Sequence, residues 1–322
     1  MDNFDDQVCK ECIAVGEYKG DDPSQVAKLS GCRCNRTNEI QIKRAGTKYR
    51  IEIEQIDNRK IVKITADINV SLDRVYSLLM EILRFENLYE GIFFMFTSFK
   101  VDGAECIEKY RKLFLNYTHS NKQYVLLPMD LDDQTYKKFF LKSQKVIKKA
   151  FLRHQAFLNA LFVNDLTVDV RMSLILEVYE SLVNEMASNG EITLKAQPYR
   201  IYKNPCPKCG AIVTRKEPNK KAYLVDKIYA VMNEYGKDIF VGDSKTKIAR
   251  KSKNLRNKID HISKQKNAMQ GEQAGFYLHK FGLMYRIIIL KMIDGYNDEI
   301  RRTVNTWMVA MNNRYAQYRI LP

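Results

Sequence analysis

The segment from Asn254 to His261 combines residue types that suit a reaction on RNA. On a helix its apolar residues face a core, whereas Arg256, Asn257 and His261 lie outside that apolar face. An imidazole titrates near neutral pH, so it can take a proton from a ribose 2′-hydroxyl or give one to a leaving 5′-oxygen. A guanidinium can hold the phosphate as negative charge builds on its oxygens. We therefore predict a transesterification without a catalytic metal, with these three residues as the catalytic group.

The sequence around this segment is strongly basic. Residues 245–266 hold nine lysines and arginines and one acid, in a chain with a net charge of +15 and a pI near 9.3. Such a surface attracts polyanions. The residues predicted to bind RNA are Lys245, Lys247, Arg250, Lys251, Lys253 and Lys258. A second run, residues 135–153, holds seven lysines and arginines and no acid, and is explained equally well as a solvated surface.

A structural interpretation of the same segment stays open. Arg256 and Asp260 are four residues apart, so they can form a surface ion pair on a helix, with His261 facing solvent. The remaining histidines have no comparable neighbours and are predicted to be structural: His119, His154 and His279.

The spacing of the motif also bears on assembly. Arg256 and His261 are five residues apart, so on a regular helix their directions diverge by about 140°. One copy alone makes an incomplete site. Two copies packed about a two-fold axis would line one cleft with both sets of residues. We therefore expect a homodimer or a higher even-numbered homo-oligomer.

The seven cysteines favour metal binding over disulfides, because a chain without a secretory start is expected in a reducing cytoplasm. Two CxxC pairs and one CxC pair are present, and paired thiolates can hold one face of a structural, tetrahedral zinc. Four ligands need two pairs, and the sequence does not decide between two sets. The first is Cys9, Cys12, Cys32 and Cys34; the second is Cys9, Cys12, Cys206 and Cys209.

Composition and periodicity predict an α+β fold. The chain has 322 residues of which 45% are hydrophobic, enough for a buried core, and no apolar run approaches the roughly 20 residues that span a membrane. Residues 1–36 form a cysteine-rich segment. Residues 37–128 are expected to form a small α+β domain, with strands in the alternating stretch 40–68 and a helix from Ser71 to Gly91.

Residues 129–322 are expected to form an α-helical bundle. Helical periodicity extends over 136–163, 166–182, 222–235, 254–267, 272–293 and 300–315. Residues 191–216 interrupt it as a hairpin with the Cys206–Cys209 zinc knuckle. We expect this hairpin to staple the helices, so that its loss destabilises the bundle.

The motif Arg256-Asn257-x-x-x-His261 resembles the signature of the HEPN superfamily of ribonucleases, an arginine, a polar residue and a histidine near the start of a helix in a bundle. The resemblance covers about residues 130–322. With an α+β domain ahead of the bundle, the chain is similar to Apea-type anti-phage HEPN proteins. This implies a metal-independent endoribonuclease with a composite dimer site in anti-phage defence. The cysteine clusters are not part of the general family pattern.

A non-catalytic interpretation keeps the same fold. Zinc knuckles and basic runs would then grip the phosphates of RNA, or a protein partner, without turnover. Cleavage of RNA in EDTA that leaves 2′,3′-cyclic phosphate ends separates an enzyme from a binding module. DNA is a poorer substrate, because the predicted reaction uses the 2′-hydroxyl that DNA lacks.

Overall fold

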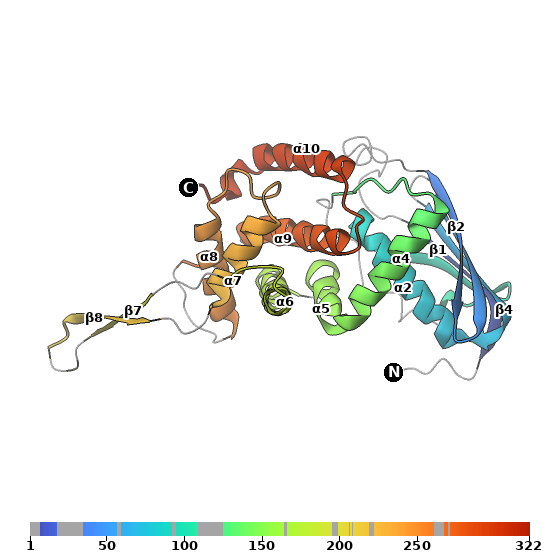
Figure 1. The fold of residues 1–322 in the computed structure, drawn as a ribbon, viewed down its shortest axis with the longest axis horizontal. Helices are drawn as coiled ribbons and strands as arrows, with labels where there is room; N and C mark the ends of the chain where they lie inside the picture. Colours follow the sequence, from blue (N-terminus) through green and yellow to red (C-terminus); the bar gives the residue numbers. More distant parts are fainter. Residues whose placement is uncertain are drawn as a thin grey trace.

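The structure, a computed structural model, joins an antiparallel sheet to a set of helices (Figure 1). It describes residues 7–17, 35–56, 59–91, 95–108, 125–163, 166–194, 199–205, 207, 209–218, 222–260, 267–269 and 271–322. Within these ranges there are eight α-helices, one six-stranded sheet and one two-stranded hairpin. The predicted α+β class is confirmed.

The six-stranded sheet is antiparallel throughout, with the strand order β2-β3-β4-β1-β5-β6. Its strands are β1 (Val8–Glu17), β2 (Arg36–Arg44), β3 (Thr47–Ile56), β4 (Arg59–Ser71), β5 (Met95–Val101) and β6 (Ala104–Glu105). Along β3, buried residues alternate with exposed or half-buried ones, so one face of the sheet meets the core. The alternation in residues 40–68 therefore predicted these strands correctly.

Strand β1 lies inside the sheet, between β4 and β5. A shift in its register between Cys9 and Glu11 turns both Cys9 and Cys12 toward the core, although they are three residues apart. The Asp102 carboxylate accepts hydrogen bonds from the backbone N–H groups of Lys10 and Glu11, at 2.9 and 2.7 Å. The cysteine-rich start of the chain thus supplies a central strand, which the sequence analysis did not predict.

Helices α2 (Leu72–Glu90) and α4 (Asp133–Lys149) pack against the sheet, and α9 (Gly271–Met292) meets them from the helical side. Helix α2 ends at Gly91, which has a φ of 69°, as the sequence predicted. The buried Arg286 of α9 donates to the carbonyls of Leu88 and Tyr89 at 2.9 and 2.6 Å. A Cβ atom on Gly91 would overlap this guanidinium, so the position needs glycine.

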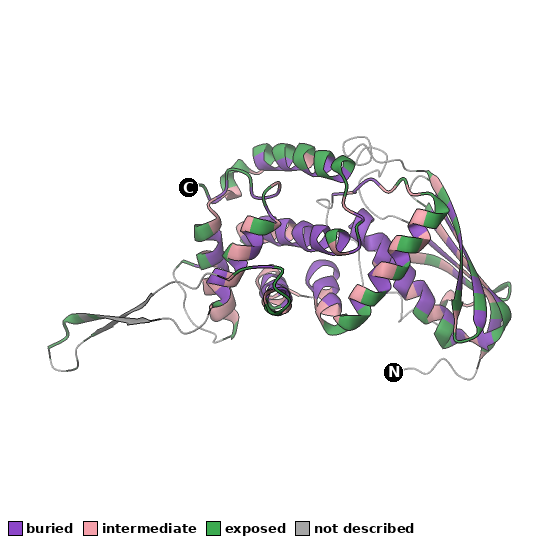
Figure 2. Ribbon diagram, in the orientation of Figure 1, coloured by how far each residue is buried: buried purple, intermediate pink, exposed green. Residues whose placement is uncertain are grey.

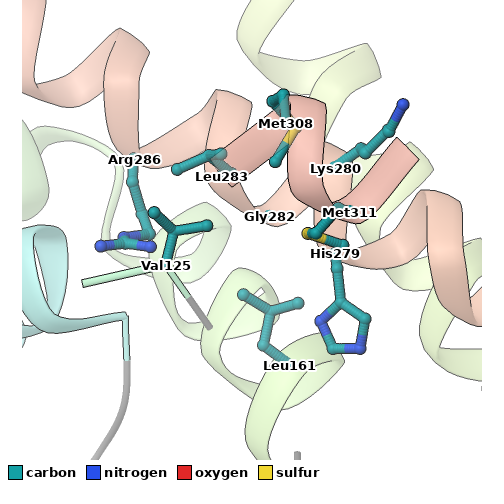
Figure 3. Close-up of a pocket in the computed structure, with 9 residues that line it drawn as sticks. All are labelled: Val125, Leu161, His279, Lys280, Gly282, Leu283, Arg286, Met308 and Met311. Atoms are coloured by element: carbon teal, nitrogen blue, oxygen red, sulfur yellow. The ribbon is translucent and has the colours of Figure 1, made fainter. Parts of the chain in front are cut away.

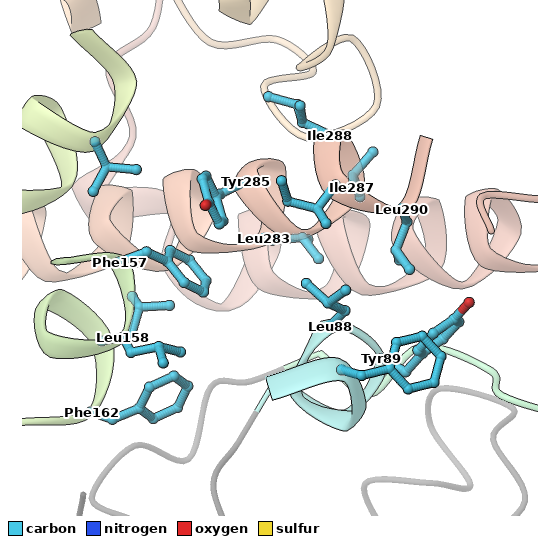
Figure 4. Packing of buried hydrophobic residues seen from close by; sticks show 14 of the residues in the cluster. Leu88, Tyr89, Phe157, Leu158, Phe162, Leu283, Tyr285, Ile287, Ile288 and Leu290 are labelled. Atoms are coloured by element: carbon cyan, nitrogen blue, oxygen red, sulfur yellow. The ribbon is translucent and has the colours of Figure 1, made fainter. Parts of the chain in front are cut away.

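The remaining helices surround α9. They are α5 (Phe151–Phe162), α6 (Val168–Ser188), α7 (Leu224–Glu234), α8 (Lys245–Asp260) and α10 (Asp298–Arg314), followed by a short 3-10 helix, η1 (Ala316–Tyr318). Helix α9 is buried on nearly every side (Figure 2). Its apolar side chains lie beside Phe157 and Leu158 of α5 and Leu88 of α2 (Figure 4), so one hydrophobic core runs through sheet and helices. The predicted helix 136–163 is two helices that meet at Ala150.

A two-stranded hairpin, β7 (Tyr199–Pro205) with β8 (Ile212–Pro218), lies between α6 and α7 in the sequence, as predicted. Among the described residues it packs against no other helix or strand, and it projects away from the helices (Figure 1). The described residues therefore give no support to the expectation that it staples the bundle. Its loss would remove no packing contact from the described helices.

Candidate functional site

Helix α8 carries the predicted site. It begins at Lys245, well before the predicted start, and buries one face that includes Leu255 against α6 and α7. Arg256 and Asn257 are half-buried and lie outside that face. The structure describes the helix as far as Asp260, and His261 lies outside the described residues. Two of the three predicted catalytic residues are thus placed at the edge of the helical body.

Three carboxylates hold the Arg256 guanidinium, and we call these four residues the Arg256 cluster. Glu180 lies 2.5 Å from one terminal nitrogen, Glu177 contacts the other, and Asp260 lies 3.1 Å from Nε. Both glutamates belong to α6, so the cluster ties α8 to α6. The Arg256–Asp260 pair of the structural interpretation is present. The side chain of Glu177 is 47% exposed, so solvent reaches the cluster.

The two glutamates of the Arg256 cluster differ in their pKa values. Partial burial raises the pKa of Glu177, against the attraction of Arg256, and repulsion by Glu180 and Asp260 adds to the rise. Burial opposes ionisation of Glu180 too, but hydrogen bonds from Lys227 and Arg256 lower its pKa. Glu180 is therefore the firmer partner of Arg256, and Glu177 is the one more readily protonated or displaced.

The predicted RNA-binding residues of α8 fall into two groups. Lys245, Lys247, Lys251 and Lys258 donate to the side chain of Asn233, the backbone of Leu321, and the side chains of Gln273 and Asp169, respectively. These contacts hold α8 against its neighbours. Arg250 is exposed and Lys253 is half-buried. The basic run is therefore only in part an open surface.

The N-terminal CxxC pair does not form the turn expected of a zinc knuckle. Cys9 and Cys12 lie in strand β1 with both side chains in the core. Burial, with Asp102 nearby, raises the pKa of Cys9 to about 11, and burial raises that of Cys12 further. Protonated thiols are poor metal ligands. The structure therefore gives no support to zinc binding by this pair. Its predicted partners Cys32 and Cys34 lie outside the described residues.

Of the C-terminal CxxC pair, the structure describes Cys209, which lies at the end of the projecting hairpin. Cys209 is exposed, Gly210 has a φ of 70°, and Cys206 lies outside the described residues. This hairpin and strand β1 are at opposite ends of the molecule (Figure 1), which excludes the shared site with Cys9 and Cys12 within one chain. In the described part of the chain, no three His, Cys, Asp or Glu side chains are grouped to hold a metal.

A small cavity lies beside α9, but it does not suit a nucleotide. Its volume is about 10 Å³, room for about one water molecule (Figure 3). It is lined by Val125, Leu161, His279, Lys280, Gly282, Leu283, Arg286, Met308 and Met311.

The histidines other than His261 have structural environments. Burial, with Arg171 adding to it, lowers the pKa of His279 to about 4. Burial, with Arg84 and Arg153 adding to it, lowers the pKa of His154 to about 3. Both imidazoles are neutral at physiological pH, in line with the structural role predicted for them. His119 lies outside the described residues.

Glu177 and Glu180 were not predicted as neighbours of the motif. The two acids lie three residues apart on a helix whose other side is apolar, which marks a polar face. The spacing of the two acids indicates a polar face of α6, but it does not show which element that face contacts. The pairing with α8 needs the tertiary structure.

Comparisons with known proteins assign this chain to no family. No family model matches it, and neither does any curated protein or solved structure. Within the described residues, no helix is both long and apolar enough to cross a membrane. The function must be argued from the residues themselves.

Proposed function

We propose that this chain is a metal-independent endoribonuclease, with Arg256, Asn257 and His261 as its catalytic residues. The observation that carries the proposal is the position of the motif on α8. Leu255 is buried, while Arg256 and Asn257 lie outside the buried face at the edge of the bundle, directly before His261. The resemblance to HEPN ribonucleases implies the same arrangement.

The proposed reaction needs a base, an acid and a cation. A histidine takes the proton of the 2′-hydroxyl, whose oxygen attacks the adjacent phosphorus, and the bond to the 5′-oxygen breaks as that oxygen receives a proton. The products are a 2′,3′-cyclic phosphate and a 5′-hydroxyl. Arg256 stabilises the charge on the phosphate oxygens, and His261 serves the proton transfers. Asn257 offers an amide that can bind the same phosphate.

The Arg256 cluster sets a condition for this reaction. A phosphate can reach the guanidinium only if it replaces one of the carboxylates that hold it. Glu177 is the most exposed of the three, and its pKa is raised, so it is the carboxylate that RNA displaces first. Glu180, which Lys227 also holds at 2.7 Å, stays in place and keeps Arg256 oriented.

The complete site is composite. Two copies pair their α8 helices about a two-fold axis, which brings two Arg256–His261 sets to one cleft. Arg250 and Lys253 of both copies flank that cleft and attract RNA. We place the enzyme in the cytoplasm and in anti-phage defence, as the resemblance implies.

A cleavage assay with defined RNA in EDTA tests the enzyme. The chain should cut RNA and leave 2′,3′-cyclic phosphate ends, and His261→Ala should abolish the cut without loss of the fold. Mixing His261→Ala with wild-type chains should lower activity if the site is composite. Cleavage by His261→Ala at the wild-type rate, or full activity of a strict monomer, contradicts the proposal.

We also propose a structural zinc held by Cys206 and Cys209 at the end of the hairpin. A tetrahedral site needs two further ligands, which would come from outside the described residues or from a second copy. Metal analysis of the purified chain should find zinc, and Cys209→Ser should lower the zinc content. Zinc-free protein with both thiols reduced would contradict this.

One observation favours a second candidate function, an RNA-binding or partner-binding module without turnover. Arg256 already has three carboxylate partners, as in an ordinary structural ion pair. Such a module would retard RNA in a gel shift and leave it intact in the cleavage assay.

A further inference from the structure

The β7–β8 hairpin is built as an arm. Its seven backbone pairs run from Tyr199 with Pro218 at the base to Pro205 with Ile212 near the tip, a length of roughly 20 Å. It packs against no other described helix or strand, and Ile212 is 70% exposed. A lone two-stranded ribbon is at best marginally stable in water. The stability of the fold therefore does not explain why the arm is there.

The arm carries a concentrated positive charge. Residues 199–218 include five lysines and arginines and one acid, Glu217, and two more lysines follow at positions 220 and 221. Glu217 pairs across the ladder with Arg200. The register sets Tyr202 opposite Arg215 and Ile201 opposite Lys216. Positive charge therefore dominates along the whole ribbon.

The basic residues of the helices are in a different situation. Lys142 of α4 pairs with Asp294 at 2.5 Å, and Lys149 of α4 pairs with Glu185 at 2.8 Å. On α8, Lys258 pairs with Asp169. Much of the positive charge on the helices is thus matched by nearby carboxylates, whereas the arm's own sequence offers a single acid.

We propose that this arm binds single-stranded RNA. Lysines and arginines along a ribbon match the spaced charges of a phosphate backbone. Tyr199 directly precedes Arg200 and Tyr202 directly precedes Lys203 in the sequence, and tyrosine rings are the platforms on which unpaired bases stack. Aromatic residues next to basic ones favour a single strand over a duplex, whose bases are already stacked. The choice of RNA rests on the proposed function, while the binding itself needs none of the catalytic residues.

The arm gives the enzyme a second binding site for its RNA substrate. It would hold a stretch of RNA outside the cleft between α8 helices and raise the local concentration of the strand there. Loss of RNA binding by the arm should therefore weaken overall binding and raise KM, while kcat for bound RNA stays close to its original value.

RNA binding by the full chain tests the proposal, in a His261→Ala background that prevents cleavage. The probe is a fluorescent 20-nucleotide oligouridine. The arm variant carries Arg200→Gln, Lys203→Gln, Arg215→Gln and Lys216→Gln. A control removes the same charge from exposed residues at the other end of the molecule: Lys43→Gln, Lys48→Gln, Lys138→Gln and Lys145→Gln.

We expect the arm variant to bind at least about tenfold more weakly than the control variant. The slope of log K against log salt should also fall, by about 0.7 for each lost phosphate contact. Because the arm packs against no other described element, circular dichroism and thermal unfolding of the variant should match the wild type. Equal affinity of the arm and control variants overturns the proposal, as does a preference for the RNA duplex.

The four arm substitutions could weaken binding by misfolding the hairpin. Photo-crosslinking of the same oligouridine to the chain without arm substitutions avoids this problem. Crosslinks should map to 199–218, and their absence overturns the proposal. The outcomes also separate the two proposals. If the chain with His261 leaves RNA uncut, but binding in the His261→Ala background still needs the arm, the ribonuclease is rejected and the arm proposal is kept. If the chain with His261 cuts RNA, but the arm and control variants bind RNA equally, the arm proposal is rejected and the ribonuclease is kept.

Discussion

Arg36 on β2 and Arg256 on α8 each pair with two glutamates one turn apart on a neighbouring helix. Arg36 contacts α2, where the side chain of Glu86 is 1% exposed. Arg256 contacts α6, where the side chain of Glu177 is 47% exposed. The same kind of ion pair is sealed in the core at one place and open to solvent at the other. Of these two ion pairs, only the open one leaves a carboxylate in contact with solvent, where an anion can replace it.

The buried group, which we call the Glu86 cluster, consists of Arg36, Lys60, Glu86, Glu90 and Tyr136. Lys60 contacts both glutamates, and the Tyr136 hydroxyl donates to Glu86 at 2.6 Å. Burial alone would raise the pKa of Glu86, but Arg36 and Lys60 lower it to about 2. Burial, helped by repulsion from Glu86, raises the pKa of Glu90 to about 7. These groups join the sheet to α2 and α4.

The largest expected effect is at the open cluster. Arg256→Ala should lower the rate of RNA cleavage by about 10²–10⁴-fold, because the phosphate loses its cation in the transition state. The free energy of unfolding should change by no more than about 1 kcal/mol, as for a partly exposed ion pair. Cleavage kinetics and urea unfolding measure the two effects. Arg302→Ala, at an exposed position of α10, is the control, and equal cleavage by both variants would refute the catalytic assignment.

The buried cluster should show the opposite result. Glu86→Ala leaves Arg36 and Lys60 without their main partner in the core, so the free energy of unfolding should fall by about 3–5 kcal/mol. Glu39→Ala, which removes an exposed partner of Arg50, should have little effect. Urea unfolding compares the two variants. A small loss from Glu86→Ala would show that water reaches the cluster and that the comparison fails.

The two carboxyls of the Glu86 cluster predict a pH dependence. The pKa of Glu90 is raised from 4.5 to about 7, so its contribution to stability is complete below pH 4.5 and is lost as the pH rises through 7. Glu90→Gln imitates the protonated form. It should match the wild type at pH 5 and exceed it at pH 8 by about 1–3 kcal/mol.

Urea unfolding between pH 5 and pH 8 checks this difference. Glu86→Gln is the control, because the pKa of Glu86 is lowered to about 2 and its stabilisation is lost only as the pH falls through that value. That variant should therefore be less stable than the wild type at every pH from 5 to 8. A difference between Glu90→Gln and wild type that does not vary with pH would contradict the prediction.

The smallest expected effect sharpens the comparison. Glu177→Gln removes the most exposed carboxylate that competes with phosphate for Arg256, so RNA should bind about two- to fivefold more tightly. Fluorescence anisotropy in the His261→Ala background measures it, and Glu52→Gln on the sheet provides the same change of charge far from α8. Weaker binding by Glu177→Gln would mean that Glu177 positions Arg256 and is not displaced.

Local patterns predicted much of the fold. Alternation gave the strands of residues 40–68, and one apolar helical face gave α2 with its end at Gly91. The burial of Leu255 and the position of Arg256 outside the buried face were also predicted from helical periodicity. These features depend on neighbours within a few residues, so a sequence shows them directly.

Features that depend on distant contacts were not predictable in the same way. Strand β1 was not predicted, because a register shift puts Cys9 and Cys12 on one face and so breaks the alternation expected of a strand. The first half of α8 was missed because lysines dominate it, although Ile248 is buried. The carboxylates around Arg256 come largely from α6, more than 70 residues earlier in the chain.

The hydrogen bonds of Arg286 affect how the protein unfolds. Arg286 belongs to the central helix α9, and its guanidinium donates to carbonyls in the last turn of α2. If α9 unwinds, the carbonyls of Leu88 and Tyr89 lose their partner, and if α2 unwinds, a buried cation loses its acceptors. Sheet and bundle should therefore unfold together in a single calorimetric transition. A fragment cut near residue 128, where the composition changes, would leave this charge without its acceptors in a stretch of apolar core.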